Sequence, residues 1–591
     1  MAEVRLTYNG LVSGLRRLIG NDHMVLVVLG LIVGSLAGCA VILFRETISL
    51  AQIIFYGSRS ERLFANADSL HWWQIVFVPV AGGLIVGLLI RFLMPDKRPE
   101  GVADVIEASA LKGGRMSSRT GLIAALTSAI SVGAGASVGR EGPAVHLGAS
   151  LAGWMGRRLG LTRSLVRTLL GCGVAAAVAA SFNAPIAGAL FASEVVIGHY
   201  ALKAFAPIVI ASVAGTALSR SWFGDFPAFT INEIYINSFW EFPAFVGLGV
   251  VSGLAAMIFM RAIELAQKSA AASPVPDWIR PAVAGLAVGL MGLAFPQVLG
   301  VGYGVTEQAL LVKIPLVMLL AFAVAKIAAT AISIGWGFAG GVFSPSLVIG
   351  ALLGGAYGVI VTNIFPDLSS GPAAYALVGM GAMAAAVLGA PISTTLIIFE
   401  MTGDYALTLG VMLAVVISSE ITHIFYGRSF FAEQLKRRGI DLKGGFETEI
   451  LGTVKIGDML SPGAETVALD LALPALRKRL QESKTGDLFV VRDSGALYGT
   501  ITLADLSDLA FDAAIDDLIR AGDVARTAPP VLTTGDDLEA ALALLSDSGE
   551  DLIAVVEDLD TMAFKGCVTH SEIMAAYNRA LLESRHEEHG H

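Results

Sequence analysis

The sequence predicts a helical membrane domain that crosses the bilayer many times, followed by a smaller soluble α/β region. Of the 591 residues, 55% are hydrophobic and only 15% are charged, which is far from the composition of an average soluble protein. Apolar runs long enough to cross a bilayer recur from residue 24 to about residue 425; examples are 24–44, 73–94, 242–260 and 406–424. After Gly427 the sequence becomes polar, and short strand and helix patterns alternate.

Basic residues flank the predicted membrane domain on both sides. Arg5, Arg16 and Arg17 precede the first apolar run, which has full membrane-spanning length and no cleavable signal pattern. Arg428 and the basic run 436–438 follow the last one. Because basic residues favour the cytoplasmic side, we expect an integral protein of the plasma (inner) membrane with both termini in the cytoplasm.

The membrane domain contains an internal repeat, which divides it into halves at about 24–225 and 240–427. Its glycines and prolines recur at constant offsets. Gly133, Gly135, Gly139 and Pro143 correspond to Gly335, Gly337, Gly341 and Pro345. Further on, segment 183–194 mirrors segment 389–400, and each places a glutamate, Glu194 or Glu400, nine residues after a proline. Duplicated halves with Gly/Pro-interrupted segments are typical of transporters, whose binding sites lie between the halves.

Segment 133–143 reads Gly-Ala-Gly-Ala-Ser-Val-Gly-Arg-Glu-Gly-Pro. An interrupted, charged backbone at membrane depth is tolerated only where it is packed in protein or lines a water-filled path. Each copy of the segment precedes an apolar helix, expected at 144–159 and 346–364. Helix N-termini offer free N–H groups and a positive dipole end, so two of them between the halves predict an anion site that needs no lysine.

The soluble region also repeats. Segments 488–491 and 552–556 are matching strand candidates, and segment 499–505 matches 566–572. We expect a linker at 428–453, one unit at 454–515, a second at 520–580 and a polar tail at 581–591. Residues 1–23 form a cytosolic N-terminal segment, and residues 24–427 form the membrane domain.

Three motifs together resemble the CLC family of chloride channels and chloride/proton antiporters: Gly139-Arg-Glu-Gly-Pro143, Gly341-Val-Phe-Ser-Pro345 and Asn183-Ala-Pro-Ile-Ala-Gly188. The C-terminal pair resembles the tandem CBS domains that many CLC proteins carry on their cytosolic side. The resemblance implies an all-α polytopic fold of inverted halves with broken helices, joined to a cytosolic α/β CBS pair. It also implies a homodimer in the lipid bilayer with a separate anion path in each subunit.

The resemblance assigns roles to residues of the two glycine-rich motifs. Glu141 corresponds to the gating glutamate, whose carboxylate competes with the anion for the outer site. The backbone N–H groups of Arg140, Glu141 and Gly142 line that outer site, and those of Val342 and Phe343 line the central one. The alternative reading of Glu141 is a salt bridge or helix cap with Arg140.

Three positions depart from the family pattern. Glu100 stands where the family has a serine that contacts the central anion, and Phe431 stands where it has an anion-contacting tyrosine. Without these hydroxyls we expect weak anion binding at the central site. Val195 stands where proton-coupled members usually carry a glutamate, which favours passive chloride flow. Glu194 could still relay a proton, and chloride/proton antiport therefore remains the alternative.

The CBS pair resembles modules that bind adenosine nucleotides. Thr502 and Asp505, and in the second copy Thr569 and Glu572, match positions where a hydroxyl meets phosphate and an acid meets ribose. The alternative is that the pair only stabilises the dimer. A third, different hypothesis is a membrane-anchored nucleotide sensor without ion flux.

Other functions have little support in the sequence. No nucleophile–base constellation indicates an enzyme, nothing indicates a nucleic-acid partner, and transport of chloride, with or without protons, requires no cofactor. Cys39, Cys172 and Cys567 form no metal motif, and the His586/His589 spacing is not that of a metalloprotease helix. We interpret His146 and His199 as packed or interfacial residues.

Overall fold

A computed structural model describes residues 22–58, 70–198, 202–225, 229, 236–440, 454–460, 464–483, 485–506, 516, 518–548 and 550–589. Arg5, Arg16, Arg17, His199 and the second half of the expected linker 428–453 lie outside these residues. The chain divides into two compact units, Met1–Asp441 and Leu442–His591. Within the described residues of the first unit, eight helices are long and apolar enough to cross a membrane.

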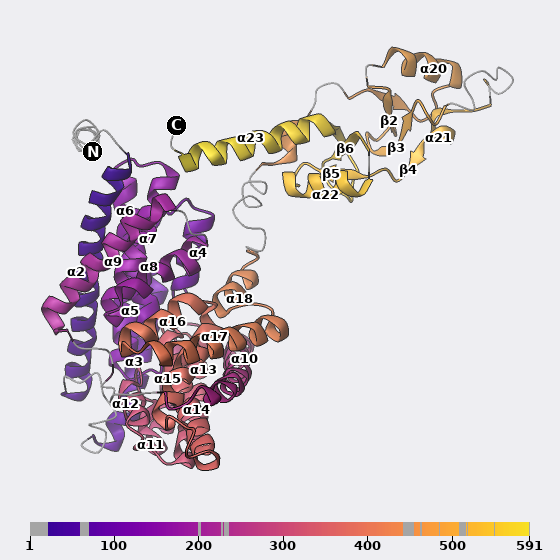
Figure 1. Cartoon of the computed structure of the whole chain (residues 1–591). Helices are drawn as coiled ribbons and strands as arrows, with labels where there is room; N and C mark the ends of the chain where they lie inside the picture. Colours follow the sequence, from indigo (N-terminus) through magenta and orange to yellow (C-terminus); the bar gives the residue numbers. More distant parts are fainter. Residues whose placement is uncertain are drawn as a thin grey trace. The chain divides into compact units, whose positions relative to one another are not determined.

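The helices of the membrane unit occur in two successive sets (Figure 1). The first set is α2 (Asp22–Tyr56), α3 (Trp72–Leu93), α4 (Val102–Ala110), α5 (Ser118–Gly133), α6 (Glu141–Arg158), α7 (Arg163–Phe182), α8 (Pro185–Phe191) with a π-helical turn Ala192–Ile197, and α9 (Leu202–Phe223). The second set is α10 (Phe242–Ala272), α11 (Arg280–Ala294), α12 (Tyr303–Leu310), α13 (Leu316–Gly335), α14 (Phe343–Ile364), α15 (Pro372–Leu388), α16 (Pro391–Thr402) and α17 (Tyr405–Tyr426), followed by α18 (Phe430–Arg437).

The packing of the helices repeats in the same order as the sequence motifs. Helix α2 packs against α7 and α9, as α10 packs against α15 and α17, and α6 packs against α7 as α14 packs against α15. Contacts of α3 with α11 and of α8 with α16 join the two sets. The predicted repeat is therefore present in the tertiary structure, and the halves meet through corresponding elements.

Glycines allow the closest of these helix contacts. A Cβ atom on Gly148 of α6 would lie 2.4 Å from the carbonyl oxygen of Gly173 on α7, and one on Gly350 of α14 would lie 2.3 Å from that of Gly379 on α15. Such distances are below any normal carbon–oxygen contact. Because apolar side chains gain little by leaving lipid for protein, membrane helices associate through close backbone packing of this kind.

The ends of α7 and α15 also correspond. Asn183 follows α7 and Gly389 follows α15 as the C-terminal capping residues, and both have left-handed backbone conformations with φ of 60° and 68°. Glycine and asparagine are the residues that adopt this conformation most easily. In each half a proline then occupies the first turn of the next helix, Pro185 in α8 and Pro391 in α16, where its missing N–H group costs nothing.

The second unit consists of two similar α/β repeats. The first contains β1 (Thr466–Ala468), α20 (Leu473–Glu482), β2 (Asp487–Val491) and β3 (Leu497–Thr502), with β4 (Arg526–Thr527) added after α21 (Ala521–Val524). The second contains β5 (Val531–Thr533), α22 (Leu538–Ser548), β6 (Leu552–Val556), β7 (Phe564–Thr569) and α23 (His570–His589). In both repeats the first two strands are parallel and the next pair is antiparallel, and the predicted strands 488–491 and 552–556 fall within β2 and β6.

The opening segments of the two repeats are exchanged. The N–H of Ile456, before β1, donates to the carbonyl oxygen of Asp536 (2.9 Å), and Ile456 is buried in the core of the second repeat. The N–H of Ala521, before β4, donates to Leu471 (2.9 Å), and Ala521 is buried in the first. The sequence bounds 454–515 and 520–580 thus describe the repeats along the chain, whereas each core borrows its opening segment from the other.

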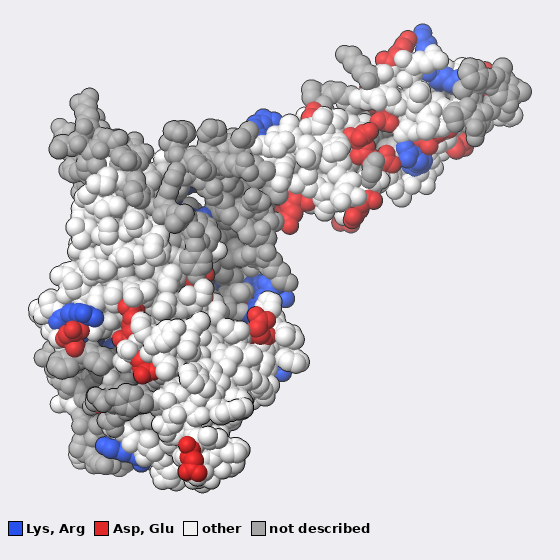
Figure 2. All heavy atoms as spheres, viewed as in Figure 1, with Lys and Arg blue, Asp and Glu red and all other residues white. Residues whose placement is uncertain are grey.

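Charge follows the division into two units. On the face shown in Figure 2, charged side chains are sparse over the membrane unit and frequent on the C-terminal unit. Helix α23 continues to His589, so most of the expected tail 581–591 extends this helix; His591 lies outside the described residues.

Candidate functional site

The two glycine-rich motifs meet directly, backbone to backbone. The N–H of Gly139 donates to the carbonyl oxygen of Gly341 (2.7 Å), and the N–H of Gly341 donates to that of Gly139 (2.8 Å), as an isolated antiparallel bridge. A reciprocal pair of this kind relates the two segments by a local two-fold axis. The structure therefore brings together the motifs that lie 202 residues apart in the sequence.

Two helices begin immediately after this bridge. Helix α6 starts at Glu141 and α14 at Phe343, so Pro143 and Pro345 lie inside the first turns rather than before the helices, as the expected ranges 144–159 and 346–364 implied. The early start is favourable because a proline in the first turn removes no intrahelical hydrogen bond. The first-turn N–H groups of both helices are consequently directed to the junction of the halves.

A third helix N-terminus reaches the same junction. A Cβ atom on Gly142 would lie 3.3 Å from the Cα of Gly341 and 3.8 Å from Cγ2 of Val102, the first residue of α4. Gly142 of α6 is therefore packed closely against the starts of both other segments. The N-terminal ends of α4, α6 and α14 thus converge on one place, and their dipoles favour a negative charge there.

Glu141 supplies such a charge from within the protein. Its side chain is 1% exposed, and its Oε1 accepts a hydrogen bond from the Tyr303 hydroxyl (2.7 Å). The Nε of Arg140 lies 3.8 Å from the same oxygen, which is an ion-pair distance rather than a hydrogen bond. The carboxylate therefore lies at a helix N-terminus and beside Arg140, which are the contacts that the alternative reading of a salt bridge or helix cap implies.

The residues predicted for the central site are also buried. Val342 is 1% and Phe343 is 5% exposed. The Phe343 ring packs against those of Phe182 (4.8 Å between centroids) and Phe191 (6.0 Å). These rings come from the ends of α7 and α8, so the first half supplies an apolar wall for the start of α14.

Glu100, which precedes α4, has a specific partner. Its Oε2 lies 3.0 Å from Nε2 of His146 on α6, without the alignment of a hydrogen bond, and the His146 side chain is fully buried. An ionised carboxylate that pointed into the central site would repel an anion there. In the structure it faces an imidazole, and the interpretation of His146 as merely packed omits this contact.

Phe431 is 6% exposed on α18, where its ring packs edge-on against Phe430 at 5.9 Å. Helix α18 lies within the range expected to be a linker but belongs to the membrane unit. It is attached to α4 by Arg438, whose Nη1 lies 2.8 Å from Asp104 and 3.4 Å from Glu107. Glu100 and Phe431 are thereby held on two elements that pack together.

The two mirrored glutamates exchange hydrogen bonds between the halves. Glu194 accepts from the N–H groups of Ile392 (2.9 Å) and Ser393 (2.8 Å) at the start of α16. Glu400 accepts from the corresponding N–H groups of α8, at Ile186 (2.9 Å) and Ala187 (2.7 Å). Each carboxylate therefore caps a helix of the opposite half, where a negative charge is stabilised. Val195, beside Glu194, is half-buried.

Sequence reasoning missed Tyr303 and Lys326. Lys326 is fully buried in α13, and its Nζ donates to the carbonyl oxygens of Val298 (3.1 Å) and Gly300 (2.8 Å) in the loop before Tyr303. A signal was present, because a lone lysine inside an apolar helix is by default a functional candidate. A second signal was the pair of glycines in Gly300-Val-Gly302, which interrupts the apolar sequence just before Tyr303.

The predicted nucleotide residues are engaged within the C-terminal unit. Oδ2 of Asp505 accepts from the N–H and the hydroxyl of Thr502 (both 2.8 Å) and from Arg526 (3.0 Å). Oε2 of Glu572 accepts in the same way from the N–H and hydroxyl of Thr569 (both 2.9 Å). In both copies the carboxylate thus accepts hydrogen bonds from the last residue of a strand, β3 or β7, and stabilises the turn that follows it.

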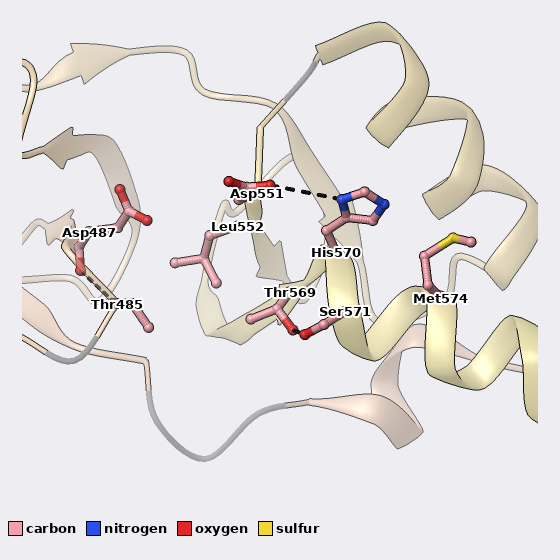
Figure 3. Close-up of a pocket in the computed structure, with 8 residues that line it drawn as sticks. All are labelled: Thr485, Asp487, Asp551, Leu552, Thr569, His570, Ser571 and Met574. Atoms are coloured by element: carbon pink, nitrogen blue, oxygen red, sulfur yellow. Dashed lines mark hydrogen bonds and ion pairs between the residues drawn. The ribbon is translucent and has the colours of Figure 1, made fainter.

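A cavity of about 410 Å³ lies between the two repeats (Figure 3). It is lined by Thr485, Asp487, Asp551, Leu552, Thr569, His570, Ser571 and Met574. Of the four predicted nucleotide residues, Thr569 belongs to this lining. Burial, followed by the charges of Glu550, Asp551 and Asp505, raises the pKa of the Asp487 carboxyl above its usual value. Two carboxylates, Asp487 and Asp551, thus line the cavity.

Comparison with known proteins places the chain in a family. The model of the voltage gated chloride channel family matches residues 82–423. A ClcB-like protein of Ralstonia nicotianae is 35% identical over 419 residues, which are 70% of this chain and 97% of that protein. The chain therefore belongs to the CLC family of voltage-gated chloride channels.

Two solved structures share the fold. A slow cyanobacterial Cl⁻/H⁺ antiporter has a TM-score of 0.63 at 22% identity, covering 70% of this chain and 97% of its own. A eukaryotic CLC transporter has a TM-score of 0.61 at 20% identity, covering 93% and 97%. The family and the CLC-type fold predicted from the sequence are thus confirmed, and the two small C-terminal sheets are consistent with a CBS pair.

Proposed function

We propose that the protein conducts chloride through a path between the two halves of its membrane unit, and that the carboxylate of Glu141 gates this path. The observation that carries the proposal is the position of Glu141. A buried carboxylate occupies the place where the N-termini of α4, α6 and α14 converge, which is the place most favourable to an anion. Chloride and the carboxylate would compete for it, and protonation of the carboxylate would release the site to chloride.

We further propose that the flow is passive. Val195 cannot carry a proton, and both carboxylate oxygens of Glu194 are engaged by N–H groups of α16. These hydrogen bonds give Glu194 a role as a helix cap, which does not require it to carry a proton. Chloride/proton antiport is the alternative, since the cyanobacterial protein of similar fold is a Cl⁻/H⁺ antiporter.

The test is made in liposomes that contain the purified full chain. Under a chloride gradient, the zero-current potential is expected to follow chloride alone and to be unaffected by an added pH gradient. Glu141→Gln, which cannot ionise, is expected to conduct with little dependence on pH and several-fold faster than the native chain at pH 7.5. Uphill proton movement driven by chloride would establish antiport instead, and absence of flux in both forms would support the membrane-anchored sensor.

The remaining expectations belong to the same proposal. We propose a homodimer in the inner membrane with cytoplasmic termini, in line with the family fold and the basic residues that flank the spans. We also propose that the cavity beside Thr569 binds an adenosine nucleotide that modulates chloride flux. Its volume suits a nucleoside, whereas Asp487 and Asp551 oppose a phosphate; the phosphate would therefore extend away from these two side chains.

A further inference from the structure

Among the described residues, Tyr303 makes the shortest side-chain contact with the carboxylate of Glu141. It is the first residue of α12 and lies outside both glycine-rich motifs. Its hydroxyl donates to Oε1 of Glu141 across 2.7 Å, and both side chains are buried. A neutral hydroxyl that donates to a buried carboxylate forms a strong, charge-assisted hydrogen bond.

The surroundings of Tyr303 hold its ring in place. The guanidinium carbon of Arg140 lies 4.9 Å from the centre of the ring, and the ring of Phe229 packs edge-on at 5.1 Å. Within the described residues, the second oxygen of Glu141, Oε2, is buried without a hydrogen-bond partner. The carboxylate is therefore fixed through one oxygen, and the Tyr303 hydroxyl is its directional contact.

The backbone that carries Tyr303 is tied to the segment that carries Glu141. The Lys326 ammonium donates to the carbonyl oxygens of Val298 and Gly300. The N–H of Gly300 in turn donates to the carbonyl oxygen of Gly135 across 3.0 Å. Gly302 adopts φ of 99°, and a Cβ atom there would lie 2.9 Å from Val348. The loop is thus held from both halves, which defines the position of the hydroxyl.

We propose that Tyr303 is a positioning residue for the gate: its hydroxyl holds the ionised carboxylate of Glu141 in the anion site and thereby slows chloride flow. The inference rests on the proposed function of Glu141. Protonation of the carboxylate removes the charge that strengthens this hydrogen bond, so the same proton that neutralises the gate also loosens its attachment. Replacing the hydroxyl with hydrogen removes the hold without altering the ring.

The experiment compares variants of the full chain in chloride-efflux measurements from liposomes between pH 4.5 and 8. Tyr303→Phe is expected to raise flux at pH 7.5 about tenfold and to shift the onset of activation toward neutral pH. In a Glu141→Gln background the same substitution is expected to change flux less than twofold, because the ionised partner is gone. Tyr56→Phe is the matched control, since this buried tyrosine donates to the Ala134 carbonyl oxygen (2.9 Å) rather than to Glu141.

Chloride binding by calorimetry gives a second readout that is independent of flux. Tyr303→Phe is expected to tighten apparent chloride binding at pH 7.5, because the carboxylate competes less well for the site. The proposal is overturned if Tyr303→Phe behaves like the native chain, or if it has the same effect with Gln at position 141. If neither the native chain nor Glu141→Gln conducts or binds chloride, the proposed function itself fails. Unchanged thermal stability and elution volume of each variant exclude misfolding.

Discussion

At the scale of single residues, the anion site depends on a small number of side chains. Glu141 provides a buried carboxylate at the junction of the three helix N-termini, where Tyr303 and Arg140 surround it. A second carboxylate, Asp104 in the first turn of α4, accepts from the N–H of Gly101 (2.8 Å). At the two positions assigned to the central site we expect no side-chain hydroxyl, because Glu100 carries a carboxylate that faces His146 and Phe431 carries a phenyl ring. Backbone N–H groups are then the principal donors for a central anion, and we expect the native chain to bind chloride more weakly than the micromolar range.

Restoring one hydroxyl tests this account. Phe431→Tyr is expected to tighten chloride binding by roughly tenfold to a hundredfold, because a hydrogen bond to an ion contributes about 1.5–3 kcal/mol and about 1.4 kcal/mol corresponds to a factor of ten. Calorimetric titration of the full chain with chloride measures it. Phe430→Tyr, the same change on the adjacent residue of α18, is the control and should leave the affinity unchanged. Equal effects of the two substitutions would contradict the assignment of Phe431.

At the scale of secondary-structure elements, the halves are joined by helix N-termini. Glu194 caps α16 and Glu400 caps α8, so each half completes a helix of the other. The pair also offers a direct comparison between two chemically identical residues in corresponding places. Only Glu194 lies at the position where a proton role was considered.

Substituting these glutamates one at a time separates capping from proton transfer. Glu194→Ala and Glu400→Ala are each expected to destabilise the protein by about 1–2 kcal/mol, the usual cost of a lost helix cap, seen as a lower unfolding temperature in detergent. Glu194→Gln and Glu400→Gln keep an acceptor oxygen and should lose less. Proton movement in liposomes is expected to be alike in all four variants. A selective loss of coupled proton transport in the Glu194 variants would instead identify Glu194 as a relay.

At the scale of the whole molecule, the chain consists of two units with separate cores. The membrane unit contains both glycine-rich motifs and the proposed anion site. The C-terminal unit contains the cavity between its repeats, and the exchange of opening segments makes those repeats mutually dependent. A ligand in that cavity contacts both repeats, because Asp487 comes from one and Thr569 from the other.

We therefore expect nucleotide regulation to require the full chain. A chain that ends at Asp441 is expected to retain chloride flux and to show no response to nucleotide. In the full chain, millimolar AMP, ADP or ATP is expected to change the flux, and Thr569→Val is expected to weaken the response several-fold. Thr502→Val is the matched control, since Thr502 makes the same turn but does not line the described cavity. No response to any of the three nucleotides in the full chain would reject regulation and leave the C-terminal unit a structural role.

Much of this protein could be predicted from the sequence because its information is local and periodic. Apolar runs, glycine and proline spacing and strand patterns depend on residues near one another in the chain, and they indicated the membrane unit, its repeat, the C-terminal pair and Glu141. The tail expected at 581–591 was less well predicted. Helix α23 continues through most of it, and its polar sequence contains no signal that separates helix from tail. The predicted starts of α6 and α14 were three residues too late, because a proline fits both just before a helix and within its first turn.

What only the tertiary structure decided are the contacts between residues far apart in the chain. The Gly139–Gly341 bridge, the Tyr303 hydroxyl on Glu141, the Glu100–His146 pair and the crossed caps of Glu194 and Glu400 each join segments separated by tens to hundreds of residues. No pattern in the sequence encodes which of several polar side chains will meet, because that depends on how the halves pack. The sequence by itself predicted an anion site with a carboxylate in it; the packing of the two halves decided which residues contact that carboxylate.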